Sequence, residues 1–295
     1  MDEGLRTRIE AFCVLSVEER LHTMRSVADD AWGAFREGRM DAAVAATLRR
    51  ALVDIVTSGE GSGQERLSVG VLLGRIGDPR LRRPSDADYW ARLTLESGDH
   101  LDLARFEVTN HEYRAWADAG GYADRAAWSD EGWAWLQACE NPWPTLAAHA
   151  ETDRLLVPNQ PVVSVTWFEA DAYARASGAR LPRWYERVWA VRGVAKRKYP
   201  WGSPFGEGNT NSKEEVLQRP CAVGLYVRDC TPDGIYDLAG NVGEWTAEQA
   251  GHEYLLHPGS WDQPSLAAWG KALTTEAPES RWPALGFRLA RDVEE

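Results

Sequence analysis

Cysteine and histidine, the residues best suited to bind a transition metal, are few and widely spaced in this chain. Of four cysteines, the closest pair is Cys221 and Cys230, and of six histidines, the closest pair is His252 and His257. Metal sites of these residue types usually include cysteines two to four positions apart. No two cysteines here have that spacing. The sequence therefore favours no transition-metal site. The alternative is a site in which the Cys221/Cys230 pair or the His252/His257 pair converges with carboxylates.

The first 84 residues are predicted to form a small helical region. Its first proline is Pro79, as helices require, and apolar residues recur at helical spacing, most clearly between 44 and 55. Ser16 with Glu19 three positions later predicts a capping box that opens a helix. We expect about four short helices here, with a structural or docking role.

The composition changes from residue 85 to residue 295. This part holds 14 of the 15 tryptophans, and its short apolar pieces are interrupted by glycine, proline, asparagine and aspartate. Such a pattern predicts short strands and long loops packed around large rings. Two segments, 110–119 and 167–177, still predict helices. The expected fold class is α+β, with a domain over 85–295 preceded by the helical region.

The overall charge limits the classes of partner. The net charge is −12, and hydrophobic and charged residues make up 44% and 26% of the chain, as in ordinary globular proteins. An acidic surface disfavours nucleic acids and anionic membranes. There is no apolar run of ~18 residues and no apolar stretch in the first twelve residues. We therefore expect a cytoplasmic protein with reduced thiols.

Six motifs of the second part occur in a characteristic order. They are FEVTNHEYRAWADAGGY (106–122), QPVVSVTWFEADAYARASGARLP (160–182), YPWG (199–202), DGIYDLAGNVGEW (233–245), PGSW (258–261) and GFRLA (286–290). This order resembles the formylglycine-generating enzyme family, also called the sulfatase-modifying-factor family. The resemblance implies a C-type-lectin-like fold, with PVVSVTW as a buried strand. It also implies that GFRLA is a central strand, with Phe287 in the core and Arg288 held by carboxylates or backbone carbonyls.

Two metal chemistries of the family have no counterpart in the motifs of this chain. The generating enzymes bind copper through cysteines between the last two motifs, but here the segment 262–285 has none. A second branch resembles iron enzymes of thiohistidine biosynthesis, which use an H-x3-H-x-E motif in a helical bundle. The predicted helical region contains a single histidine, His22. The resemblance therefore leads us to expect neither copper nor iron.

A third branch of the family keeps the fold without the chemistry. It includes the variable proteins of diversity-generating retroelements, in which the segment between a GSW-like motif and GFRLA is diversified. Our main hypothesis is a non-catalytic module that binds a ligand or a protein, with a retroelement-diversified recognition protein as the form that this branch suggests. The alternative is a metal-dependent oxidoreductase or hydroxylase of the same family with an unrecognised metal site.

The segment 262–285 would then be the recognition surface. Aromatic and arginine side chains commonly anchor protein partners. The candidate ligand contacts are Asp262, Gln263, Ser265, Trp269, Lys271, Glu276, Arg281 and Trp282. The expected partner is another protein, bound through this loop face and through the helical region.

One calcium site is implied by the resemblance. GNVGEW is similar to the family's GNVWEW segment, which binds calcium through oxygen ligands. By position, the ligands would be the carbonyls of Gly240 and Val242 and the side chain of Glu244, helped by Asn241. Gly243 departs from the family, which has tryptophan there.

A second departure lies in the segment LPRWYERVWAVRG (181–193). Glu186 is retained, but Arg187 and Val188 stand where the family has a Trp-Glu pair. This change weakens the expectation that an inherited active-site floor survives.

Overall fold

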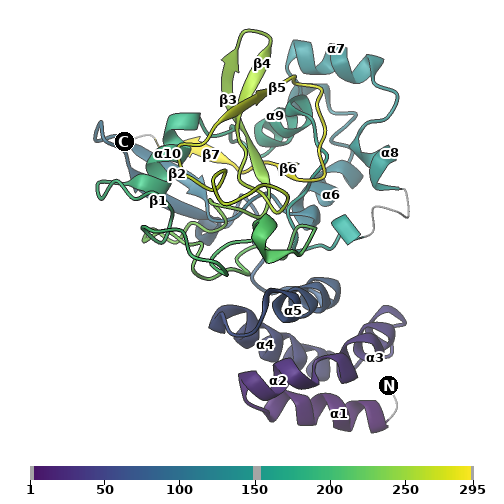
Figure 1. The fold of residues 1–295 in the computed structure, drawn as a ribbon. Coiled ribbons are helices and arrows are strands. Elements are labelled where there is room, and N and C mark those ends of the chain that lie inside the picture. The colour runs from purple at the N-terminus through teal and green to yellow at the C-terminus, as the bar shows by residue number, and fades with distance from the viewer. Residues whose placement is uncertain (1–2, 149–153, 294–295) are drawn as a thin grey trace.

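The chain folds into two parts that meet near residue 80 (Figure 1). The computed structural model describes residues 3–148 and 154–293. Helices from the first quarter of the chain stack at one end of the molecule, and the rest forms a mixed part with small sheets, helices and long loops (Figure 1). The predicted α+β architecture with a preceding helical region is confirmed.

The helical region contains five helices within the described residues, one more than expected. They are α1 (Glu3–Val14), α2 (Val17–Thr23), α3 (Arg25–Arg36), α4 (Ala42–Ser58) and α5 (Gly63–Ile76). The predicted capping box is present, because the Ser16 hydroxyl accepts the N–H of Glu19 while the Glu19 carboxylate accepts the N–H of Ser16. Ile9, Leu48 and Leu52 are fully buried between the helices, so burial of apolar side chains stabilises the bundle.

The helical region packs directly on the mixed part. Leu217, Leu225 and Tyr226 of the mixed part belong to the same apolar core as the helices. Close approach is possible because α5 carries glycine, and a Cβ on Gly74 would lie 2.2 Å from Oδ1 of Asn159. The boundary after residue 84 stays a prediction about the domain organisation, but the two parts share one core where they meet.

Two small sheets lie in the mixed part. The first is antiparallel, in the order β1–β2–β7, and the second has the order β5–β4–β3–β6, with β6 parallel to β3. Their bounds are β1 (Trp90–Thr94), β2 (His100–Ala104), β3 (Gly243–Ala250), β4 (Glu253–His257), β5 (Thr274–Glu276), β6 (Leu285–Gly286) and β7 (Ala290–Asp292). The final strands thus bring the C-terminal segment into both sheets.

The mixed part also contains short helices. They are η1 (Ala87–Tyr89), α6 (Asn110–Asp118), η2 (Arg125–Ala127), α7 (Asp130–Ala138), α8 (Trp143–Ala147), α9 (Trp167–Ala176), α10 (Trp184–Arg192) and η4 (Lys213–Glu215). Helices α6 and α9 were predicted and are confirmed. The sequence did not predict α7, α8 and α10, because their short, tryptophan-containing sequences lack a regular apolar stripe. No helix in the described ranges is long and apolar enough to cross a membrane.

Phe287 and Arg288 of the GFRLA segment are buried as predicted, whereas the PVVSVTW segment does not form the predicted strand. Phe287 and Arg288 are fully buried, and Arg288 is held by the Glu244 carboxylate and by backbone carbonyls, as predicted. PVVSVTW is largely buried but forms only an isolated bridge between Pro161 and Thr109. The predicted strand is therefore wrong, because Ser164 has a φ of 60°, which an extended strand does not accommodate.

Candidate functional site

Glu244, the predicted calcium ligand, has two guanidinium partners. Strand β3 buries Glu244 completely. Nε of Arg187 on α10 donates to its Oε2 at 2.8 Å, and Nη2 of Arg288 donates to its Oε1 at 2.7 Å. Burial alone would raise the pKa of Glu244, but the two positive charges outweigh it and lower the pKa to about 2. Since this carboxylate is already neutralised by the chain, the geometry does not support calcium at Glu244.

The other predicted calcium ligands lie inside a buried hydrogen-bond network. Oδ1 of Asn241 accepts the N–H of Cys221 at 3.0 Å, and its Nδ2 donates to Glu107 at 3.1 Å. The N–H of Val242 donates to the same Glu107 carboxylate. A Cβ on Gly240 would lie 2.5 Å from a backbone oxygen. The segment 240–244 therefore holds the interior of the mixed part together.

The described residues do not fit a copper or iron centre. Within 3–148 and 154–293, no three His, Cys, Asp or Glu side chains come together as a metal site. His257 is buried, its Nδ1 accepts the N–H of Gly259 and its Nε2 donates to the carbonyl of Trp269 at 3.0 Å. Burial lowers the pKa of His257 to about 3, so the ring is neutral and both nitrogens are used. His252 is exposed on the turn between β3 and β4.

The eight candidate contacts of the segment 262–285 divide into two groups. Asp262, Gln263, Trp269, Lys271 and Trp282 are exposed, whereas Ser265, Glu276 and Arg281 are half-buried.

The half-buried members of this segment make internal contacts. Arg281 forms an ion pair with buried Glu169 at 2.6 Å and donates to the carbonyl of Ser164 at 2.8 Å. Glu276 on β5 accepts a hydrogen bond from Ser280. Arg281 therefore stabilises the loop from inside. Recognition of a partner by the exposed members stays a prediction.

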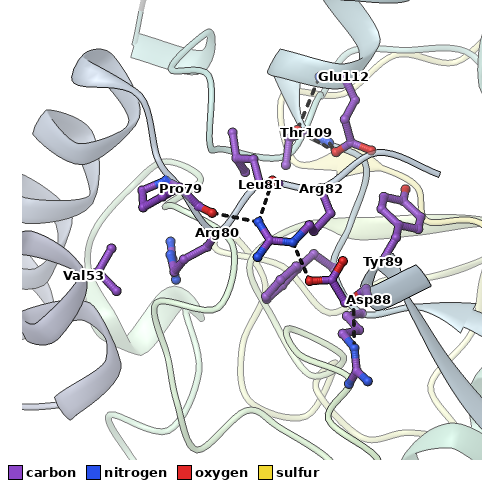
Figure 2. A pocket seen from close by; sticks show the side chains of 11 residues that line it. Val53, Pro79, Arg80, Leu81, Arg82, Asp88, Tyr89, Thr109 and Glu112 are labelled. Atoms are coloured by element: carbon purple, nitrogen blue, oxygen red, sulfur yellow. Dashed lines mark hydrogen bonds and ion pairs between the residues drawn. The ribbon is translucent and has the colours of Figure 1, made fainter. Parts of the chain in front are cut away.

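A cavity that the sequence did not predict opens where the helical region meets the mixed part (Figure 2). Its volume is about 550 Å³. Val53 on α4, the connecting segment 79–82, the end of η1 and residues between 105 and 112 line it. A cavity of this size between two packed parts is typical of a small-molecule site. We call it the junction cavity.

Three arginines line the junction cavity. Arg80 forms a two-pronged ion pair with Asp78, and Nε of Arg82 donates to Oδ2 of Asp88 at 2.5 Å. Within the described residues, the hydrogen bonds of Arg105 go to three backbone carbonyls, at 3.0–3.2 Å. The positive charge of Arg82 and, to a smaller extent, that of Arg105 lower the pKa of Asp88, so this carboxylate faces both arginines.

Tyr89 and Glu112 form the opposite wall. Oε2 of Glu112 accepts the N–H and the hydroxyl of Thr109, at 3.0 and 2.6 Å, and so caps α6. Oε1 of Glu112 and the hydroxyl of Tyr89 are buried and, within the described residues, lie against each other without a hydrogen bond of normal length. The Tyr89 hydroxyl points toward the Glu112 carboxyl group (Figure 2). Burial raises the pKa of Glu112 to about 7 and raises that of Tyr89.

Comparison with known proteins places the second part of the chain in a family. Residues 91–293 match the sulfatase-modifying factor enzyme 1-like domain. The chain is 31% identical to a hercynine oxygenase of Mycolicibacterium thermoresistibile over 235 residues, which cover 65% of this chain and 51% of the relative. It is 36% identical to the inactive C-alpha-formylglycine-generating enzyme 2 of Mus musculus over 149 residues, covering 44% of this chain and 48% of the relative. The chain therefore spans about half the length of the curated relatives it matches.

Among solved structures, PvdO from Pseudomonas aeruginosa is similar with a TM-score of 0.49 and 22% identity, covering 66% of this chain and 82% of that chain. This likeness has no bearing on function.

Two expectations from the sequence are corrected by these relatives. The hypothesis of a non-catalytic binding module is wrong, because the match that covers 65% of the chain is to a protein named as an oxygenase. The expectation that no copper or iron takes part fails on the same finding, since oxygen chemistry depends on a metal or another cofactor. The described residues nevertheless gather no such centre, so we assign none of them as a metal ligand.

The family prediction itself is confirmed. The match covers more than two thirds of the chain and includes all six motifs, which lie between residues 106 and 290. The chain belongs to the sulfatase-modifying factor enzyme 1-like family.

Proposed function

We propose that this chain is an oxidoreductase of the sulfatase-modifying-factor family, related to the hercynine oxygenases, and that the junction cavity holds its substrate. The observation that supports the proposal best is the extent of the match, because similarity to the oxygenase covers 65% of the chain against 44% for the inactive relative. The whole activity stays a proposal, since the chain spans about half of either relative.

The junction cavity is the best candidate for the substrate site for two reasons. It lies between two packed parts, where small-molecule sites are common. It also offers a group able to move protons near neutral pH, because burial raises the pKa of Glu112 to about 7. In this proposal, Oε1 of Glu112 takes or returns a proton, Tyr89 orients it, and Phe106 and Leu81 exclude water from the cavity. No step is assigned to a metal.

Oxygen uptake tests the proposal. The full chain, supplied anaerobically with ferrous or cuprous ions, would be mixed with hercynine, a thiol and oxygenated buffer in an oxygen electrode. We expect uptake that depends on hercynine and falls at least tenfold in Glu112→Gln. Arg83→Gln is the matched control, because Arg83 is exposed and next to the cavity lining. Uptake no greater than that of free metal ions would overturn the proposal.

A further inference from the structure

An open groove lies between helix α10 and the turn that joins β1 to β2. Its volume is about 1010 Å³, and it is lined by residues between 94 and 99, residues between 185 and 196, and Lys271. Nε1 of Trp189 on α10 donates to the carbonyl of Thr94 at 2.9 Å and so ties the helix to the turn. We call it the α10 groove. It shares no lining residue with the junction cavity.

The segment that carries Lys271 is held against the end of α10. The N–H of Gly270 donates to the carbonyl of Lys198 at 3.1 Å, and a Cβ on Gly270 would lie 2.5 Å from the side chain of Val191 on α10. Three segments that are far apart in the sequence therefore meet at the groove.

Three cations line the α10 groove without forming an ion pair within the described residues. They are Arg192, Lys196 and Lys271, and they include two of the four lysines of a chain whose net charge is −12. Arg192 donates to the carbonyl of Arg197 at 3.4 Å, while Arg197 itself donates to carbonyls at the end of α10. Cations that have no carboxylate partner in the chain attract an anion from outside it.

Aromatic and apolar side chains adjoin these cations. Tyr185 is 47% exposed and Val194 is 87% exposed, whereas Trp189 is half-buried and its indole N–H is already bonded. Both rings line the groove. They therefore offer surface on which a flat ligand can stack.

The turn between β1 and β2 supplies two carboxylates, those of Glu96 and Asp99. Oδ2 of Asp99 accepts the hydroxyl of Ser97 at 2.7 Å, and neither carboxylate forms an ion pair with a described cation. The groove thus keeps its negative and positive groups apart, which disfavours a strand of nucleic acid with its many phosphates. Carboxylates are suitable acceptors for the hydroxyl groups of a sugar.

We propose that the α10 groove binds a mononucleotide, with the phosphate at the cations, the base on the aromatic rings and the sugar hydroxyls at the turn. A phosphate monoester carries a charge of about −1.5 to −2 and three strong acceptor oxygens, which match Arg192, Lys196 and Lys271. A carboxylate, with one charge and two oxygens, would leave part of this positive charge unpaired. The proposal does not depend on the oxidoreductase activity, because the groove is separate from the junction cavity.

Calorimetry with parts of the ligand tests the proposal. The probes are the four ribonucleoside monophosphates, their nucleosides, ribose phosphate and inorganic phosphate. We expect the full chain to bind at least one nucleotide at least tenfold more tightly than its nucleoside, ribose phosphate or inorganic phosphate. No binding of any nucleotide, or equal affinity for a nucleotide and inorganic phosphate, would overturn the proposal.

Exposed side chains allow the groove to be changed without disturbing the core. The double variant Lys196→Gln with Lys271→Gln should weaken nucleotide binding at least tenfold, whereas Lys213→Gln, at an exposed lysine outside the groove, should leave it unchanged. Tyr185→Ala should weaken the nucleotide at least fivefold and leave ribose phosphate as it was. Melting temperatures measured in parallel show whether each variant is folded, and the comparison of probes needs no variant. Full affinity for the nucleotide in the folded double variant would refute the assigned site.

Discussion

Glu112 combines two roles that usually belong to different residues. One oxygen of its carboxyl group caps α6, as many glutamates at the third helical position do. The other oxygen is buried beside Tyr89 at the cavity wall. The sequence contains the Thr-x-x-Glu pattern of the cap, but nothing in it indicates that this particular cap is sealed from water.

Replacing Glu112 with glutamine should change how stability depends on pH. A glutamate titrates near 4.5 in the unfolded chain, and burial raises the pKa of Glu112 to about 7 in the folded one. Its contribution to stability is therefore complete below pH 4.5 and is lost as the pH rises to 7. Since glutamine also caps helices, we expect Glu112→Gln to match the original chain at pH 4.5 and to exceed its unfolding free energy at pH 8 by up to about 3 kcal/mol. Urea unfolding at both pH values measures this.

Glu65 provides the control for that experiment. It occupies the same capping position on α5 but is only half-buried, and its hydrogen bonds to Ser62 lower its pKa. Its stabilising effect is present above pH 4.5 and lost as the pH falls, so Glu65→Gln should shift the pH profile in the opposite direction. Parallel profiles for the two variants would contradict our account of Glu112.

Arg187 should be essential for stability. It is 1% exposed and pairs with fully buried Glu244. Arg187→Met removes one of two positive charges from this carboxylate, and breaking a buried pair costs roughly 3–5 kcal/mol. Arg183→Met, at an exposed position before the same helix, should change stability by less than about 0.5 kcal/mol. Denaturant titration of both variants distinguishes them, and similar midpoints would show that Arg288 alone suffices.

This pair illustrates the limit of sequence reasoning at single residues. The partner groups of Arg288 could be predicted from its motif. The contact between positions 187 and 244 could not, because it depends on how α10 crosses β3. The sequence marked Arg187 as a departure from the family, and the structure gives this departure a physical role.

At the scale of elements, the docking face of α5 depends on small residues. Gly74 faces the buried side chain of Asn159, and Nδ2 of Asn159 donates to the carbonyl of Gly70 at 3.0 Å. A larger residue would push the helical region away from the mixed part.

Two glycine substitutions in helices should therefore have opposite effects. Gly74→Ala places a Cβ 2.2 Å from Oδ1 of Asn159 and should destabilise the chain by about 1–3 kcal/mol. Gly33→Ala in α3 meets no atom within 4 Å and should stabilise the chain by about 0.5–1 kcal/mol, because alanine loses less backbone entropy than glycine on folding. Thermal melting of both variants is the measurement. A Gly74→Ala variant as stable as Gly33→Ala would refute the tight contact.

Helices whose apolar residues recur at helical spacing could be predicted from the sequence, and segments without such spacing could not. Helices α6 and α9 carry apolar stripes and caps that are visible in the sequence. The family resemblance implies a strand at PVVSVTW (161–167), but Ser164 turns the backbone, and the N–H of Ser164 donates to carbonyls more than 100 positions away. Such long-range contacts have no local signal.

For the whole molecule, the shared core implies that the two parts unfold together. Leu217, Leu225 and Tyr226 would be exposed to water if the helices detached. The junction cavity exists only in this assembled state, because Val53 and the mixed part both line it. This also explains why the sequence did not predict the cavity, whose walls come from four separate segments.

Two spectroscopic probes can test this coupling. Fourteen of the 15 tryptophans lie after residue 85, so tryptophan fluorescence reports mainly on the mixed part. Circular dichroism at 222 nm reports strongly on the five helices of the first part. We expect the two signals to change at the same urea concentration. Loss of ellipticity before fluorescence would indicate that the helical region unfolds independently, as a boundary at residue 84 would allow.

The pairing of Arg187 with Glu244 affects how the stability of the protein depends on calcium. Because the countercharge is covalently part of the polypeptide, nothing has to be captured from the surroundings to neutralise this carboxylate. We therefore expect the protein to have the same melting temperature in the presence of the chelator EDTA and in millimolar calcium. The folding of the segment around Glu244 would then not depend on the calcium concentration around the protein.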